Sequence, residues 1–162
     1  KARGATIIAE LVGYGTNSDG QHVTQPSANT MQLAMEMAIK DAEISASDIG
    51  YVNGHGTATE KGDIAETLAT EKAVGKQTPI SSLKSYLGHT LGACGTIEAW
   101  ASINMMNDNW FAPTANLEQV DALCGELNYI QGEGLEQKSD FVMTNNFAFG
   151  GINTSLIFKR YC

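Results

Sequence analysis

The sequence is poor in basic residues and proline, and it contains no long apolar run. Ten Lys and Arg stand against eighteen Asp and Glu, which gives a formal net charge of −8. Nucleic-acid binding depends on clustered basic side chains, so this balance argues against a nucleic-acid partner. No basic amphipathic helix is evident, which argues against an anionic membrane surface. No apolar stretch approaches the roughly 20 residues that a membrane-spanning helix needs.

Cysteine is also scarce, with Cys94, Cys124 and Cys162 widely spaced and no C-x-x-C pair. An odd, scattered set of cysteines predicts a reducing compartment, without a disulfide framework or a zinc site, and we expect a cytoplasmic protein. The basic start at Lys1 precedes too few apolar residues for a signal peptide. Because the chain has no initiator methionine and leads directly into a strand pattern, we expect it to be a piece of a longer protein.

Strand and helix patterns alternate along the 162 residues, a length that suits one domain spanning residues 1–162. We expect strands at 5–14, 47–52, 79–83, 141–144 and 152–158, helices at 29–42, 63–74 and 93–107, loops at 16–29, 84–89 and 110–114, and a short helix or turn at 119–127. Asn29 or Thr30 is the expected cap of the first helix. This order predicts an α/β layered fold, in which ligands gather beyond the carboxyl ends of strands.

Two histidines lie in glycine-rich loops, His55 between Gly54 and Gly56, and His89 after Gly88. Glycine lets the backbone come close to a bound group, and imidazole changes protonation near neutral pH. Lys84 precedes His89 by five residues. This arrangement favours a catalytic site, whereas the remaining histidine, His22, is predicted to be a solvated loop residue.

Several kinds of site could use such a pair. A zinc site needs further ligands at metal-binding spacing, and a phosphate-binding loop needs a glycine pattern that residues 88–95 match only loosely. Either imidazole could instead be a satisfied core residue. The remaining interpretation is work on an acyl group: two neutral imidazoles donate N–H groups to one carbonyl oxygen and stabilise an enolate. Lys84 would keep the local potential positive and disfavour a charged histidine.

Three motifs resemble signatures of the β-ketoacyl-acyl carrier protein synthases. They are H-G-T-x-T-x-x-G-D-x-x-E from His55 to Glu66, K-x-x-x-G-H-x-x-G-A-x-G from Lys84 to Gly95, and N-F-x-F-G-G-x-N from Asn146 to Asn153. The pattern is most similar to the bacterial elongating enzymes that use two histidines, as synthase I does. The resemblance implies a thiolase-like fold, a layered mixed sheet with helices, of which this chain would be the C-terminal half.

The resemblance also implies an activity in fatty acid or related polyketide synthesis. Family enzymes form an acyl-cysteine intermediate, decarboxylate malonyl-carrier protein and join the resulting carbanion to the acyl group. His55 and His89 would then donate to the malonyl thioester carbonyl, with Lys84 important for the electrostatics of the site. The acyl-accepting cysteine belongs to the N-terminal half, so we expect the isolated chain to be inactive.

Substrate binding is implied for a second group of residues. Thr57 and Thr59 match the threonines that hydrogen-bond the phosphopantetheine arm carrying the substrate. Phe149 matches a gating phenylalanine whose backbone N–H contributes to the oxyanion hole, with Phe147 and Gly150 beside it. Ala148 departs from the family pattern, which has glycine there, and its Cβ is expected to stiffen the gate and alter acyl-length preference.

A set of polar residues is expected to support the site. Asp63 and Glu66 lie three residues apart and hence on one face of the helix predicted at 63–74. The resemblance implies that these carboxylates organise the site, and that Glu66 joins Asn53, Glu98 and Asn145 around a monovalent cation. A hydrogen-bonded polar network explains the same residues, and both alternatives stay open. No other metal or cofactor is expected.

The remaining expectations concern Cys94 and the partners. Cys94 occupies a position where the family has a small residue, so we predict a buried small apolar side chain. The implied partners are acyl carrier protein, the N-terminal half and a second copy in a full-length homodimer. The alternatives are a non-catalytic partner subunit of the chain-length-factor type and a carrier-protein-binding module. A thiolase proper is disfavoured because the C-terminal C-x-G motif is missing.

Overall fold

A six-stranded mixed sheet organises the computed structural model, which describes residues 1–20, 22 and 24–161; Cys162 lies outside the described residues. The strand order is β1-β8-β7-β2-β3-β5. The strands are β1 (Ala9–Ser18), β2 (Ile49–Asn53), β3 (Pro79–Ser81), β5 (Asn128–Tyr129), β7 (Phe141–Ala148) and β8 (Ile152–Arg160). β7, β2, β3 and β5 are parallel, whereas β8 is antiparallel to both of its neighbours. A separate antiparallel pair joins β4 (Trp110–Phe111) to β6 (Leu135–Glu136).

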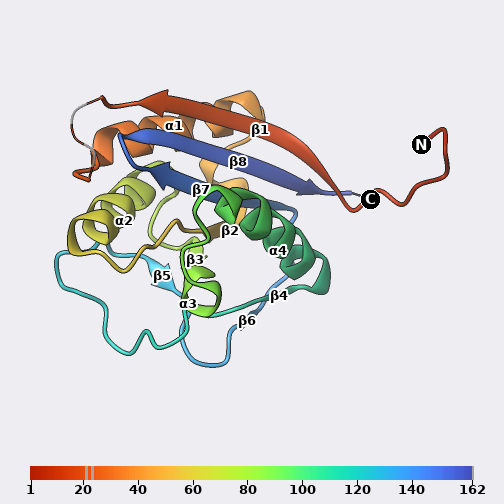
Figure 1. Cartoon of the computed structure of the whole chain (residues 1–162). Helices are drawn as coiled ribbons and strands as arrows, with labels where there is room; N and C mark the ends of the chain where they lie inside the picture. Colours follow the sequence, from red (N-terminus) through yellow and green to blue (C-terminus); the bar gives the residue numbers. More distant parts are fainter. Residues whose placement is uncertain (21, 23, 162) are drawn as a thin grey trace.

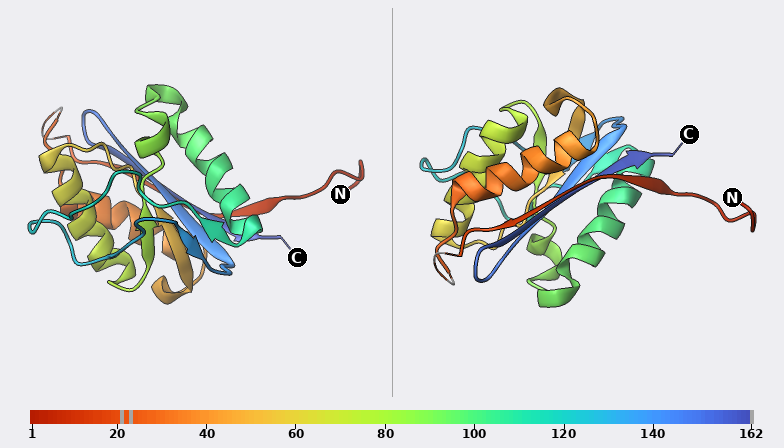
Figure 2. Two further views of the ribbon diagram at one scale, coloured as in Figure 1. Left: turned by 90° about the horizontal axis from the view of Figure 1, so that it is seen from below. Right: turned by 90° about the horizontal axis from the view of Figure 1, so that it is seen from above.

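Helices cover both faces of this sheet (Figures 1 and 2). α1 (Ala28–Asp41) and α2 (Glu60–Val74) pack on one face, and α4 (Cys94–Asp108) packs on the other. Each face has its own apolar core, one centred on Met35 and Val52 and the other on Tyr51 and Met106. Three short helical segments complete the chain: η1 (Ala46–Asp48), α3 (Lys84–Leu87) and η2 (Leu91–Ala93). The α/β layering expected from the alternating patterns is confirmed.

The close contact between β1 and α1 depends on glycine in β1. A Cβ placed on Gly15 would lie 2.0 Å from the backbone oxygen of Ala34, and one on Gly13 would lie 2.4 Å from that of Ala38. Ala34 and Ala38 are themselves completely buried. Small residues on both elements therefore let the helix backbone touch the strand.

Several predicted boundaries are wrong. The first strand continues to Ser18, through the start of the loop predicted from residue 16, because it pairs with β8 along its whole length. α1 begins at Ala28 after Ser27, and no side-chain cap closes its N-terminus, so neither Asn29 nor Thr30 is the cap. The loop predicted at 84–89 contains the helical turn α3. Residues 119–127, predicted as a short helix or turn, contain a turn at 122–123 and are otherwise irregular. The two-residue strands β4, β5 and β6 were not predicted.

In this chain α4 is buried on one side only. Its buried residues are Cys94, Glu98, Ser102, Met105 and Met106. On its other side, Trp100 is 63% exposed.

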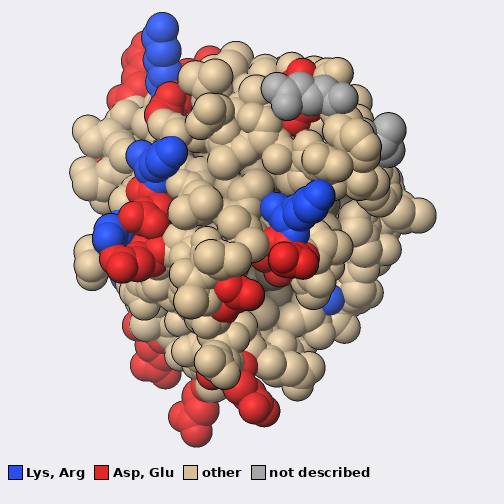
Figure 3. Space-filling model, turned by 90° about the vertical axis from the view of Figure 1, so that its left-hand side faces the viewer, with Lys and Arg blue, Asp and Glu red and all other residues tan. Residues whose placement is uncertain are grey.

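In the described part of the chain, no helix is long and apolar enough to cross a membrane. Figure 3 shows the side of the molecule where α2 lies, and the basic groups there stand apart from one another among acidic ones.

Candidate active site

The predicted site residues lie where the parallel strands end. β2 ends at Asn53, two residues before His55, and β3 ends at Ser81, three residues before Lys84. Phe147 lies near the end of β7. Because β3, β2 and β7 are neighbours and run in the same direction, their carboxyl ends deliver all three side chains to one edge of the sheet.

His55 and His89 are neighbours. Their ring centroids are 5.4 Å apart and the ring planes are perpendicular. Phe147 lies edge-on to His55 at 6.3 Å, and the Phe149 ring is parallel to that of His89 at 6.5 Å. The two imidazoles share one site, so a single substrate atom can lie within reach of both.

His55 is held as a neutral imidazole. Burial, followed by the positive charge of Lys84 and by His89, lowers its pKa from 6.5 to about 3. The residue is 8% exposed, and Nδ1 is buried without a hydrogen-bond partner among the described residues. Because Nδ1 is buried, Nε2 is the nitrogen that can reach a ligand, and the side chain of Asn146 also acts on this ring, raising its pKa. Gly56 next to it must be glycine, because a Cβ would lie 2.5 Å from Cβ of Ser82.

Glu66 fixes the backbone of the His55 loop. Its Oε1 accepts a hydrogen bond from the His55 amide at 2.6 Å, and its Oε2 accepts one from the Gly56 amide at 2.7 Å. Burial raises the pKa of Glu66 to about 7, against the lowering effect of these two amides. The carboxylate of α2 thus acts on the loop backbone and leaves the imidazole free for other partners.

His89 is held by its own loop. The backbone amide of Leu91 donates to Nδ1 of His89 at 3.0 Å, and the Cys94 sulfur lies 3.4 Å from the same nitrogen. A nitrogen that accepts a hydrogen bond carries no proton, so a neutral His89 has its proton on Nε2. That N–H is the group His89 can offer to an oxygen in the site.

Lys84 forms a buried ion pair with Glu98. Nζ of Lys84 lies 2.5 Å from Oε1 of Glu98, and the two side chains are 5% and 3% exposed. Asn146 donates to the second oxygen of Glu98 at 3.0 Å. Glu98 thereby links α3, α4 and β7 beneath the histidine pair.

The residues predicted to bind substrate line the same region. The hydroxyl oxygens of Thr57 and Thr59 are 2.9 Å apart. Phe147 is buried, whereas Phe149 is 66% exposed in the turn between β7 and β8. Gly150 has φ of 78°, a value that favours glycine. Ala148 ends β7 and pairs with Ile152, which leaves only residues 149–151 between the two strands.

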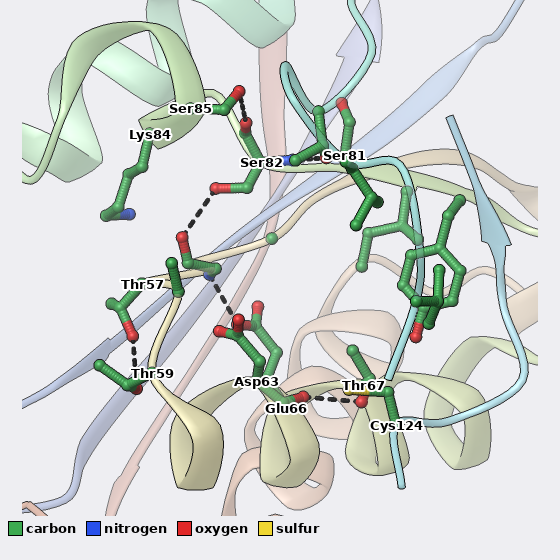
Figure 4. A pocket seen from close by; sticks show the side chains of 18 of the residues that line it. Thr57, Thr59, Asp63, Glu66, Thr67, Ser81, Ser82, Lys84, Ser85 and Cys124 are labelled. Atoms are coloured by element: carbon green, nitrogen blue, oxygen red, sulfur yellow. Dashed lines mark hydrogen bonds between the residues drawn. The ribbon is translucent and has the colours of Figure 1, made fainter. Parts of the chain in front are cut away.

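Two cavities flank the segment from Thr57 to Thr59. One, of about 740 Å³, is lined by His55, His89, Phe147 and Phe149, and His22 lies on its wall. The other, of about 630 Å³, lies between the His55 loop, α2 and the loop that follows β4. Figure 4 shows this second cavity, with Asp63 and Glu66 side by side below the loop. Burial raises the pKa of Asp63, more strongly than the backbone amides of residues 57–59 lower it.

The side chains of the four residues predicted to surround a cation do not point to one common centre. Asn53 donates to Oγ1 of Thr144, whereas Asn145 donates to Sδ of Met35 on α1. Thr144 and Asn145 are consecutive in β7, so their side chains point to opposite faces of the sheet. Glu66 and Glu98 use both of their carboxylate oxygens in the contacts described above.

Sequence reasoning missed three contributors to the site. Asn146 was noted only as a motif boundary, yet it bonds Glu98. Leu91 places its amide on His89 through a left-handed conformation, with φ of 52°. Cys94 is buried as predicted, but its sulfur contacts His89. Neither the Leu91 conformation nor the sulfur contact has a signal in the sequence, because both depend on how the loop closes.

Known proteins of similar sequence identify the family of this chain. The family model described as "Beta-ketoacyl synthase, C-terminal domain" matches residues 8–118. The chain belongs to the β-ketoacyl synthase family. Among curated relatives, it is 43% identical to the 3-oxoacyl-[acyl-carrier-protein] synthase 2 of Vibrio cholerae and 40% identical to the synthase 1 of Haemophilus influenzae, over 99% of this chain in both cases.

Solved structures confirm the thiolase-like ketosynthase fold. A β-ketoacyl synthase from Burkholderia phymatum superposes with a TM-score of 0.98 at 60% identity over 99% of this chain. A ketosynthase of a type II polyketide system, solved in complex with its acyl-carrier protein, has a TM-score of 0.92 at 33% identity over 99% of this chain. The chain covers 40%, 39%, 40% and 40% of these four proteins respectively, so it corresponds to their C-terminal part.

Proposed function

We propose that the full-length protein carrying this sequence is a 3-oxoacyl-acyl carrier protein synthase of fatty acid biosynthesis. Its reaction would be the decarboxylative condensation of malonyl-carrier protein with an acyl thioester. The observation that carries the proposal is the perpendicular contact of His55 and His89, 5.4 Å between ring centroids, next to the buried Lys84. Two neutral imidazoles at this separation can donate to one oxygen.

The proposed chemistry uses those two N–H groups as the malonyl carboxylate leaves. The bond between the carboxylate and the α-carbon breaks, CO₂ departs, and the electron pair moves onto the thioester oxygen as an enolate. The Nε2–H groups of His55 and His89 stabilise that negative charge. The α-carbon then attacks the acyl thioester, and the leaving group is a cysteine thiolate supplied from outside this sequence.

The low pKa of His55 supports this role. A protonated His55 would be a stronger donor, but its charge would bind the malonyl carboxylate and oppose its loss. With a pKa of about 3, His55 stays neutral across the physiological range. Burial is the largest cause of this low pKa and the charge of Lys84 adds to it, while Glu98 fixes the ammonium of Lys84.

The partners are part of the proposal. We infer that acyl carrier protein delivers the substrate on a phosphopantetheine arm that passes Thr57 and Thr59, and that Phe149 lies at the gate. The face that exposes Trp100 would be covered by the N-terminal half of the parent, a homodimer in the cytoplasm. For Glu66 and Glu98 we propose a hydrogen-bonded network, because the four side chains predicted as cation ligands do not fit one coordination sphere.

Separate assays of the two half-reactions of the full-length protein test this function. In a His89→Ala variant, CO₂ release from malonyl-carrier protein should fall about 100-fold or more, the cost of losing one oxyanion donor. Acylation of the enzyme by acyl-carrier protein should change only a few-fold. Equal losses in both half-reactions would contradict the assigned role of His89.

The same assays separate the enzyme from a non-catalytic partner subunit. If the wild-type protein binds carrier protein but releases no CO₂, the chain-length-factor type of function is favoured. The presence of His55, His89 and Lys84 together argues for the enzyme, because a partner that does not catalyse has no use for the buried charge pair beneath two imidazoles.

A further inference from the structure

The thiol of Cys94 lies inside the hydrogen-bond system of His89. Its sulfur is 3.4 Å from Nδ1 of His89, and Oγ1 of Thr90 donates to that sulfur at 3.3 Å. Cys94 is the first residue of α4 and is 2% exposed. The thiol of Cys94 therefore belongs to one hydrogen-bonded cluster with Thr90 and His89.

The direction of these hydrogen bonds follows from the donors available. The hydroxyl of Thr90 donates to the sulfur, so the S–H proton of Cys94 is free to point to Nδ1. The backbone amide of Leu91 points to the same nitrogen. Both contacts require Nδ1 to accept, so both stabilise the neutral ring that carries its proton on Nε2.

The loop geometry leaves the thiol few alternatives. Leu91 adopts a left-handed conformation, with φ of 52°, which is unfavourable for a residue with a Cβ. The residues 91–93 then form η2 and lead directly into α4. Because Cys94 starts the helix and is almost fully buried, its side chain is held beside the imidazole rather than exposed to water.

We propose that Cys94 is a positioning residue for His89: its S–H···Nδ1 contact, together with the amide of Leu91, fixes the ring orientation and keeps the imidazole proton on Nε2. The thiol touches no substrate in this role and acts only through His89. The catalytic consequence rests on the proposed function, because it assumes that Nε2–H of His89 meets the developing enolate. The tautomer assignment does not depend on that assumption.

NMR of the full-length protein labelled with [15N]histidine tests the tautomer directly. The His89 resonances are assigned by their loss in His89→Gln. The wild-type protein should show Nδ1 of His89 unprotonated. Cys94→Ala removes one of the two donors to Nδ1 and leaves the Leu91 amide in place, so the Nδ1 resonance should shift clearly while Nδ1 stays unprotonated. Cys94→Ser should restore the wild-type pattern, because the hydroxyl replaces the S–H donor. An unchanged Nδ1 resonance in Cys94→Ala, or a protonated Nδ1 in the wild-type protein, would overturn the proposal.

Activity provides the second measurement, with Cys124→Ala as a control for the loss of another thiol, in the loop between β4 and β5. We expect Cys94→Ala to lower kcat for CO₂ release from malonyl-carrier protein about 3- to 10-fold with little change in KM, and Cys94→Ser to retain most of it. Equal rates for Cys94→Ala and Cys124→Ala would refute the positioning role. If the wild-type protein releases no CO₂, the proposed function fails, while the NMR result still decides the tautomer assignment.

Discussion

Lys84 and Glu98 lie 2.5 Å apart, and almost no part of either side chain reaches solvent. The pair joins the short helix α3 to α4, fourteen residues further along the chain. It also places a positive charge next to His55, where that charge helps to keep the imidazole neutral. One buried contact therefore serves both the packing of the loop and the electrostatics of the site.

Removing one partner should be strongly destabilising. Lys84→Ala leaves the carboxylate of Glu98 buried without its cation, and a broken buried pair costs about 3–5 kcal/mol. The free energy of unfolding of the full-length protein, measured with urea, gives this cost. The double variant Lys84→Met/Glu98→Leu should recover much of the loss, since it leaves no unpaired charge.

The matched control is Lys76→Ala. Lys76 also pairs with a glutamate, Glu126, but both side chains are largely exposed. Exposed pairs contribute little to stability, so this variant should unfold close to the wild-type urea midpoint. If the two lysine variants are equally destabilised, the difference in burial does not determine the cost.

The pH dependence of stability should contain two opposing contributions. His55 has a folded pKa of about 3 against 6.5, so the unfolded chain binds more protons and stability is lost as pH falls from 6.5 to 3. Glu66 has a folded pKa of about 7 against 4.5, so the folded chain binds more protons and stability is lost as pH rises from 4.5 to 7. Between pH 4.5 and 6.5 the two slopes should largely cancel.

A variant that removes one of the two groups should show the pH dependence of stability that the other group contributes. Relative to wild type, Glu66→Gln should lose stability as the pH is lowered from 6.5 to 4.5, by up to about 1.4 kcal/mol per pH unit. His55→Asn should gain stability over the same interval. Urea midpoints recorded at half-unit steps of pH measure both. Parallel curves for wild type and variants would show that neither group titrates as described.

Gly15 should be intolerant of even a methyl group. Gly15→Ala would place a Cβ 2.0 Å from the backbone oxygen of Ala34, so α1 must move away from β1. Overpacking of this kind typically costs about 1–3 kcal/mol. Gly92→Ala is the control, because nothing lies within 4 Å of its Cβ position. Thermal unfolding that is equally affected by both substitutions would contradict the argument.

The sequence was most informative where apolar residues recur at a regular spacing and where glycine marks the end of an element. The helices at 29–42, 63–74 and 93–107 and the strand ends that carry His55 and Lys84 follow from these patterns, and the structure confirms them within a few residues. The buried residues of α1, Met31, Ala34, Met35 and Ala38, recur at the spacing of one helical face, which is why this helix can be predicted. Local patterns predict such elements because they report which side of an element is buried.

Contacts that depend on loop closure were beyond the sequence. Nothing in the spacing of Asn53 and Asn145 shows that they face opposite sides of the sheet, because the phase of β7 relative to β2 is set by tertiary pairing. The strands β5 and β6 are two residues long, too short for any period to appear. The irregular segment at 119–127 is shaped by packing against α2, for example by the hydrogen bond from the amide of Gly125 to Thr67.

The pairing of β1 with β8 has a consequence for biosynthesis. Ala9 lies opposite Arg160, so the first and the last strand of the described residues are paired. Contacts between distant segments form slowly, because a long loop must close before they are gained. Until β8 emerges, β1 lacks the one strand that pairs with it among the described residues, and its exposed Leu11 and Tyr14 are open to other nascent chains. We therefore expect the pairing of β1 with β8 to form late, with chaperone binding to β1 in the interval.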